Sequence, residues 1–87
     1  MSRNKRTILG VHVARRTKHT ARVQKILTDF GCSIRTRVGL HDTGDGFCSP
    51  NGLILLEVTD RVSELTAALA DVPDVTVKKM VFEESGQ

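Results

Sequence analysis

Six segments of regular apolar spacing follow one another in this chain of 87 residues. Apolar residues at every second position are typical of a β-strand, and apolar residues at i, i+3, i+4 and i+7 are typical of one helix face. The spacing is strand-like over 7–13, 34–41, 53–59 and 75–82, and helical over 17–30 and 60–70. The sequence therefore predicts the element order β-α-β-β-α-β.

Residues that begin and end helices support both helical segments. Thr17 and Asp60 offer side-chain oxygens as N-caps. Gly31 follows the first segment and tolerates the left-handed backbone that ends a helix, and 72–74, which contains a proline, stops the second. The alternation of the last strand breaks at Lys78-Lys79, which predicts either a bulge or partial cover on both faces.

This element order is the split βαβ pattern of ferredoxin-like α+β folds. Right-handed crossovers place both helices on one face of a four-stranded antiparallel sheet. We expect one domain over 1–87, with a basic arm at 1–6 and a flexible tail at 83–87. The helix-covered face is expected to consist of Leu9, Val11, Val13, Ile34, Val38, Leu40, Ile54, Leu56 and Val58.

The other face of the sheet is expected to have no cover within the chain. Its strand positions are Ile8, Gly10, His12, Arg35, Arg37, Gly39, His41, Leu53, Leu55 and Glu57. Large aliphatic residues on neighbouring strands form a patch that an isolated monomer rarely leaves in water. We expect a homo-oligomer, a dimer or tetramer, with Ile8, His12, Leu53 and Leu55 in its interface. The alternative is a mildly apolar free surface.

Composition excludes several classes of protein. No apolar stretch is long enough to span a membrane, and no signal peptide is recognised. Two cysteines are too few for a disulfide framework, so a cytoplasmic location is expected. A nucleophile elbow and a glycine-rich phosphate loop are both missing, so we do not expect an enzyme.

Charge is distributed unevenly along the chain. No acidic residue precedes Asp29, although the net charge is only +3. A basic N-terminal quarter is compatible with phosphate contacts to nucleic acid, but we favour a basic tail and a solvated face of the first helix, because runs of charge usually only solvate a surface. The chain has no Trp or Tyr, so the aromatic platform that stacks single-stranded bases is missing.

Histidine and cysteine side chains suggest one further chemistry. His12 and His41 are expected on the open face, and Cys48 follows in the adjoining loop. Imidazole and thiolate are suitable ligands for a transition metal such as nickel or zinc. The alternative is that these histidines form hydrogen bonds within an interface.

The middle of the sequence resembles a known family. The segments Arg37-Val38-Gly39-Leu40-His41 and Ser49-Pro50-Asn51-Gly52-Leu53-Ile54-Leu55-Leu56 are similar to the signature region of the small iron-only hydrogenase system regulators. The ending, with Val72-Pro73-Asp74-Val75 and Lys78-Lys79, is also similar. The resemblance covers about Arg6 to Phe82 and implies an ACT-like regulatory domain.

The same resemblance extends to the ligand-binding half of nickel-responsive repressors. It implies that His41 and Cys48 occupy positions comparable to metal ligands at a subunit interface, while Gly39 stands where the repressors have a second histidine. Their DNA-binding segment is not seen before the first strand, so we expect a regulatory protein partner. The expected ligand-binding residues are Arg37, Gly39, His41, Asn51 and Gly52.

Three functions follow from these observations. The first is a small ligand-sensing ACT-like regulator, linked to iron-only hydrogenase systems and acting as an oligomer through a partner. The second is a basic protein associated with nucleic acid, whose binding would weaken with salt. The third is a structural adaptor that docks proteins on the open face.

Overall fold

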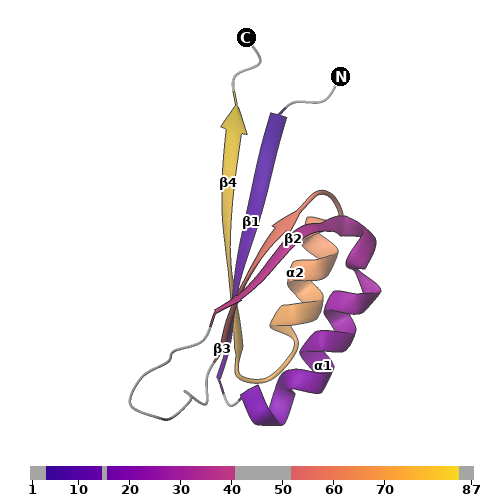
Figure 1. Ribbon diagram of the computed structural model, residues 1–87, viewed down its shortest axis with the longest axis vertical. Helices are drawn as coiled ribbons and strands as arrows, with labels where there is room; N and C mark the ends of the chain where they lie inside the picture. Colours follow the sequence, from indigo (N-terminus) through magenta and orange to yellow (C-terminus); the bar gives the residue numbers. More distant parts are fainter. Residues whose placement is uncertain (1–3, 15, 41–51, 85–87) are drawn as a thin grey trace.

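The computed structural model describes residues 4–14, 16–40 and 52–84 (Figure 1). Within these residues the predicted order of strands and helices is confirmed, with one short additional 3₁₀ helix. The elements are β1 (Asn4–Val13), α1 (Arg16–Asp29), η1 (Gly31–Ser33), β2 (Ile34–Leu40), β3 (Gly52–Val58), α2 (Val62–Ala70) and β4 (Val75–Glu84).

The four strands form one antiparallel sheet in the order β2-β3-β1-β4. Both helices lie on the same face of this sheet, α2 beside α1, and no element of the described residues covers the opposite face (Figure 1). The predicted ferredoxin-like α+β fold is confirmed. We call the uncovered side the open face.

The core lies between the sheet and the two helices. Successive residues of a strand point to opposite faces, so alternate residues of β1 are buried against the helices. Leu9 and Leu56 are fully buried neighbours on β1 and β3. The complete buried apolar set is Leu9, Val11, Val13, Val23, Leu27, Leu56, Val58, Leu65, Leu69 and Val72.

Most side chains of β2 point to the opposite face of the sheet from the one predicted. The β2–β3 register shifts between Ile34 and Thr36, where one extra residue, Arg35, is inserted. A bulge of this kind exchanges the faces of all residues beyond it. Val38, which was expected in the core, therefore lies beside Leu55 and is 44% exposed.

Arg37 and Gly39 change sides for the same reason. They pair with Leu56 and Ile54, which belong to the helix-covered side, and not with residues of the open face. The guanidinium of Arg37 donates a hydrogen bond to the side-chain oxygen of Gln24 on α1. Their expected place on the open face was wrong.

Strands β1 and β4 extend beyond the rest of the sheet. Their outer halves project past both helices as a two-stranded ribbon (Figure 1). The pairs Asn4–Glu84 and Lys5–Glu83 show that parts of the expected basic arm and flexible tail are strand. The β1–β4 register is continuous through Lys78-Lys79, so the bulge considered for that position is absent from this pairing.

The start of α2 also differs from the expected Asp60 cap. The N-cap residue is Arg61, which has a left-handed backbone (φ 56°) and makes no capping hydrogen bond with its side chain. Its guanidinium instead lies 4.5 Å from the ring centre of Phe30 and 3.0 Å from Glu64. These contacts connect the start of α2 to the end of α1.

The other end of α1 is tied to the turn before β4. Nε2 of the buried His19 lies 2.9 Å from a carboxylate oxygen of Asp74, and Asp74 has a positive φ of 67°. The backbone N–H of Ala14 donates to the carbonyl of the same Asp74. This turn therefore joins α1, β1 and β4, and holds the helical layer against the sheet.

Candidate functional site: the open face of the sheet

The open face has a large apolar component contributed by all four strands. β1–β3 pairing brings Ile8, Gly10 and His12 beside Glu57, Leu55 and Leu53, and β1–β4 pairing brings Met80 beside Ile8. Six apolar side chains with substantial exposure are found in the described residues, and all but Val81 are on this face. They are Val38, Leu53, Leu55, Met80, Val81 and Phe82.

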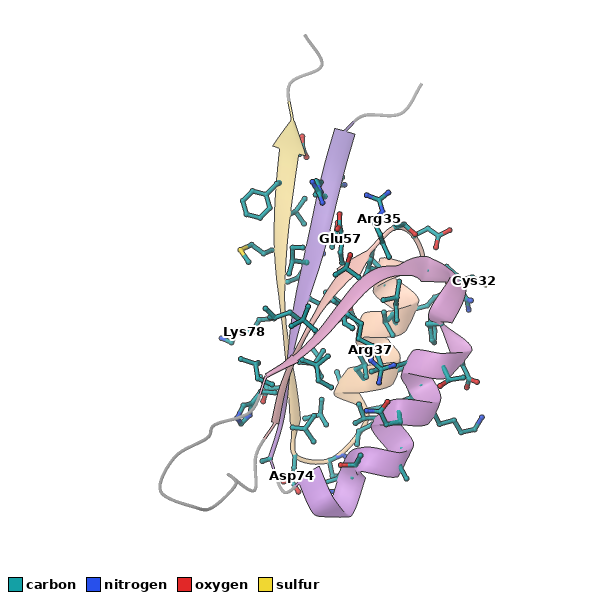
Figure 2. All side chains as sticks on the ribbon, viewed as in Figure 1. Cys32, Arg35, Arg37, Glu57, Asp74 and Lys78 are labelled. Atoms are coloured by element: carbon teal, nitrogen blue, oxygen red, sulfur yellow. The ribbon has the colours of Figure 1, made fainter. Side chains whose placement is uncertain are left out.

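A carboxylate held by two arginines also lies on this face. The Arg6 guanidinium donates two hydrogen bonds to Glu57, at 2.8 and 3.0 Å. Arg35 approaches the same carboxylate from β2, at 3.5 Å, and the closeness of Arg35 and Glu57 is visible in Figure 2. Glu57 is buried although both arginines are half or more exposed.

The electrostatics of this cluster favour an ionised glutamate. Hydrogen bonds from Arg6 lower the pKa of Glu57, burial opposes them, and the charges of Arg6 and Arg35 lower it further. The net direction is downward from the ordinary value of 4.5. At neutral pH the two arginines outweigh Glu57 within the cluster itself, although Glu83 adds a second negative charge close by.

A shallow hollow adjoins the cluster. It has a volume of about 410 Å³ and is lined by Arg6, Ile8, Phe82 and Glu83. Its walls are mainly apolar, with the arginine and glutamate supplying charge. A small molecule with an apolar part matches these walls, and an anionic group on it would fit beside Arg6, away from Glu83.

Crowding among the described residues does not explain the presence of glycine at positions 10 and 39 of the sheet. A Cβ placed on Gly10 would lie 3.8 Å from Leu55 Cδ2 and 4.0 Å from the Lys78 carbonyl oxygen, which are ordinary contacts. A Cβ on Gly39 would meet nothing within 4 Å. The packing of the chain itself therefore does not require either glycine.

The sequence-predicted site residues are only partly brought together. The expected interface residues Ile8, His12, Leu53 and Leu55 share the open face, as predicted. Gly52 is the first residue of β3 and pairs with Val13. The remaining predicted residues His41, Cys48 and Asn51 lie outside the described residues, so their grouping stays a prediction.

Arg37 lies away from the open face, beside α1 (Figure 2). It therefore does not join the cluster around Glu57. Among residues 4–14, 16–40 and 52–84, no group of three or more His, Cys, Asp or Glu side chains is arranged to hold a metal ion. The expected metal ligands His41 and Cys48 are not covered by that statement.

Three parts of the site were missed from the sequence. Val38 was placed in the core because the bulge at Arg35 was not foreseen. Arg6 was assigned to a flexible arm, so its pairing with Glu57 was not considered. Met80 and Phe82 could have been predicted, because they alternate with Lys79 and Val81. Once β1 and β4 are paired, Met80 and Phe82 fall on the same face of the sheet as Ile8.

Solved structures of similar fold include those of two other proteins. The uncharacterized protein TM1266 from Thermotoga maritima is 26% identical, with a TM-score of 0.74, over 91% of this chain and 99% of that one. CPII, a nitrogen regulatory PII-like protein from Thiomonas intermedia K12 bound to ADP, AMP and bicarbonate, is 12% identical. Its TM-score is 0.62, over 99% of each chain.

No family model matches the chain, and no curated protein matches it. The fold is thus shared with a regulatory protein that binds small molecules, and with a protein whose function is not described. Neither of the helices in the described part of the chain is long and apolar enough to cross a membrane.

Proposed function

We propose that this chain is a small, non-catalytic regulatory module that binds an anionic small molecule on the open face and acts as a homo-oligomer. The observation that carries the proposal is the hollow beside the Arg6–Glu57–Arg35 cluster, on a sheet face that no helix covers. An apolar wall next to two arginines suits an anion with an apolar body, which would bind on the arginine side of the hollow and away from Glu83.

The ligand's chemistry follows from the cluster. Glu57 is already held by Arg6, and Arg35 is the more distant of its two partners, at 3.5 Å. Arg35 can therefore turn toward an incoming phosphate or carboxylate without leaving Glu57 unpaired. The bound ADP, AMP and bicarbonate of the PII-like neighbour are anions of this type, which supports a phosphate or carboxylate ligand here.

The finer assignment rests on the sequence resemblance. The segments 37–41 and 49–56 resemble iron-only hydrogenase system regulators, so we propose a regulator of such a system that acts in the cytoplasm through a protein partner. In this proposal His41, Cys48 and Asn51 remain the candidate residues for a transition metal or ligand. A His41→Ala, Cys48→Ala variant that retains full metal and ligand affinity would remove that part of the proposal.

The first experiment is native mass spectrometry of protein purified without chelators, followed by calorimetric titration with ADP, AMP and bicarbonate. We expect an oligomer, and saturable binding of at least one of these anions. Arg35→Gln should weaken that binding roughly tenfold or more, because a charged hydrogen bond is lost. Arg22→Gln on α1 is the matched control and should leave it unchanged.

A bare monomer that takes up none of the three anions would contradict the proposal. Binding that Arg35→Gln and Arg22→Gln weaken equally would also contradict it, because the affinity would then come from overall charge and not from the cluster. Oligomer formation and anion binding are separate readouts, so each half of the proposal can fail alone.

A further inference from the structure

The outer half of β4 is an exposed strand edge with apolar residues on both sides. β4 is the last of the four described strands of the sheet, and its one partner among them is β1. Met80 and Phe82 on the open face are 52% and 53% exposed, and Val81 on the opposite side is 41% exposed. A two-stranded ribbon is only marginally stable alone, and an exposed flat apolar edge invites another strand.

The apolar residues Met80, Val81 and Phe82 have positive charges on one side in the sequence and negative charges on the other. Two lysines, Lys78 and Lys79, precede it, and two glutamates, Glu83 and Glu84, follow it. In the described part of the chain, Lys79 and Glu83 are exposed and take part in no ion pair. A strand with this pattern is complementary to a reversed copy of itself.

Symmetry restricts how two copies can pair along this edge. In an antiparallel pair related by a two-fold axis, the open faces of both copies lie on the same side of the continuous sheet. Directly opposed residues then have residue numbers that are both odd or both even, because alternate residues of a strand face opposite sides of the sheet. One residue of β4 must therefore lie directly opposite its own copy in the second molecule, and the two-fold axis runs between these two copies.

We propose that two copies of this chain pair antiparallel through their β4 strands, with the two-fold axis at Val81. This register places Lys79 of each copy opposite Glu83 of the other, and Met80 opposite Phe82. Opposite charges and large apolar side chains on directly opposed residues both stabilise a sheet. In backbone register, position 78 also lies opposite position 84.

Neighbouring registers are less favourable. An axis at Lys79 opposes two lysines, which repel each other. An axis at Met80 opposes Lys79 to Val81 and Lys78 to Phe82, and leaves Glu83 opposite Val77. The axis at Val81 is the register in which both the charges and the apolar residues of this segment are matched.

This pairing joins the two four-stranded sheets into one continuous sheet. The hollow lined by Phe82 then adjoins Met80 of the second copy, so each ligand site is completed near the two-fold axis. The inference deepens the oligomeric part of the proposed function, but the strand pairing does not require a ligand. Its tests are accordingly made on the ligand-free protein.

The direct test is a symmetric disulfide. Opposed residues of antiparallel strands have Cα atoms about 4.5 to 5.5 Å apart, which is within disulfide range. In a Cys32→Ser, Cys48→Ser background, Val81→Cys should form a covalent dimer on mild oxidation. Thr76→Cys, exposed on the same strand, is the control and should form no covalent dimer, because the two copies of position 76 would be about 34 Å apart.

Covalent dimer from Val81→Cys, with none from Thr76→Cys, supports the pairing. Equal yields from both, or none from Val81→Cys, would overturn it. Circular dichroism of the reduced variants checks that both are folded before oxidation.

Charge reversal gives the second test, with sedimentation equilibrium as readout. Lys79→Glu and Glu83→Lys each replace two attractive pairs per dimer by repulsive ones, so each should raise the dimer dissociation constant about 2- to 30-fold. The double variant restores opposite charges and should recover the original value. Asp60→Lys, in the turn before α2, is the control for an added positive charge.

Failure of the double variant to recover the dimer would overturn the Lys79–Glu83 pairing. The outcome is separate from that of the ligand proposal. Loss of anion binding in Arg35→Gln with an intact β4 dimer would leave this inference standing, and a monomer that still binds the anion would remove it alone.

Discussion

The two faces of the sheet are formed by the same strands, yet they differ in almost every physical respect. On β1, Leu9 and Val11 are fully buried beneath the helices, whereas Ile8 is partly buried and His12 is exposed. The two sets alternate along one strand, and Ile8 is as apolar as its buried neighbour Leu9. The difference comes from the two helices, which cover one face only.

The comparison shows where the chain can carry function. The covered face contributes most of the apolar burial, and its residues have little freedom to change. The open face keeps large apolar side chains and a glutamate held by two arginines, and it ends at β4, the edge strand of the described sheet. A surface of this kind can bind a ligand or a second copy without disturbing the core.

The largest expected effect is a difference in stability between substitutions at two adjacent residues of β1. Leu9→Ala removes a fully buried side chain and should lower the free energy of unfolding by about 2–5 kcal/mol. Ile8→Ala removes a partly exposed one and should cost the dilute monomer roughly 1 kcal/mol or less. Urea denaturation of both variants measures the difference, and equal losses would show that the open face is also buried in solution.

An intermediate effect is expected at the turn that ties α1 to the sheet. Asp74→Ala removes the acceptor for His19 and places alanine at a positive φ, so about 1–3 kcal/mol of stability should be lost. Asp74→Asn keeps an acceptor and tolerates that backbone, and should lose less. Thermal unfolding that ranks the two variants in the opposite order would contradict the role of this turn.

The smallest expected effect is on how stability depends on pH, through Glu57 on the open face. The pKa of Glu57 is lower when folded than its ordinary value of 4.5, so its ionised form stabilises the fold. That contribution is present above the unfolded pKa and is lost as the pH falls through the folded pKa. Glu57→Gln should flatten the decline in stability below about pH 4.5.

Denaturation at several acidic pH values measures this decline. Glu64→Gln is the control, because Glu64 is an exposed glutamate paired with Arg61 on α2. A decline that is equally steep in wild type and Glu57→Gln would contradict the assignment to the cluster.

Most of the architecture was predictable because it rests on local periodicity. The switch between spacings of two and 3.6 fixed the number and order of the elements, and the handedness of crossovers then placed both helices on one face. The alternation on β1 and β3 also identified Ile8, His12, Leu53 and Leu55 as open-face residues correctly. Their role in an interface stays a prediction.

The site was less predictable, because register is decided between strands. One inserted residue, Arg35, exchanged Val38 and Arg37 between the two faces, and nothing in the local spacing of β2 marks the insertion. The pairing of Arg6 with Glu57 joins residues 51 positions apart in the chain. Such contacts form only when β1 and β3 are neighbours.

The sequence by itself determined the succession of elements, the fold class and the apolar residues of β1 and β3 that the helices must cover, because these follow from the period of side-chain direction along a strand or helix. Tertiary structure alone decided the bulge in β2, the extension of β1 and β4 into a ribbon, and the assembly of the Arg6–Glu57–Arg35 cluster. Those features depend on which backbone groups of distant strands pair, and a period within one segment carries no information about its partner's register.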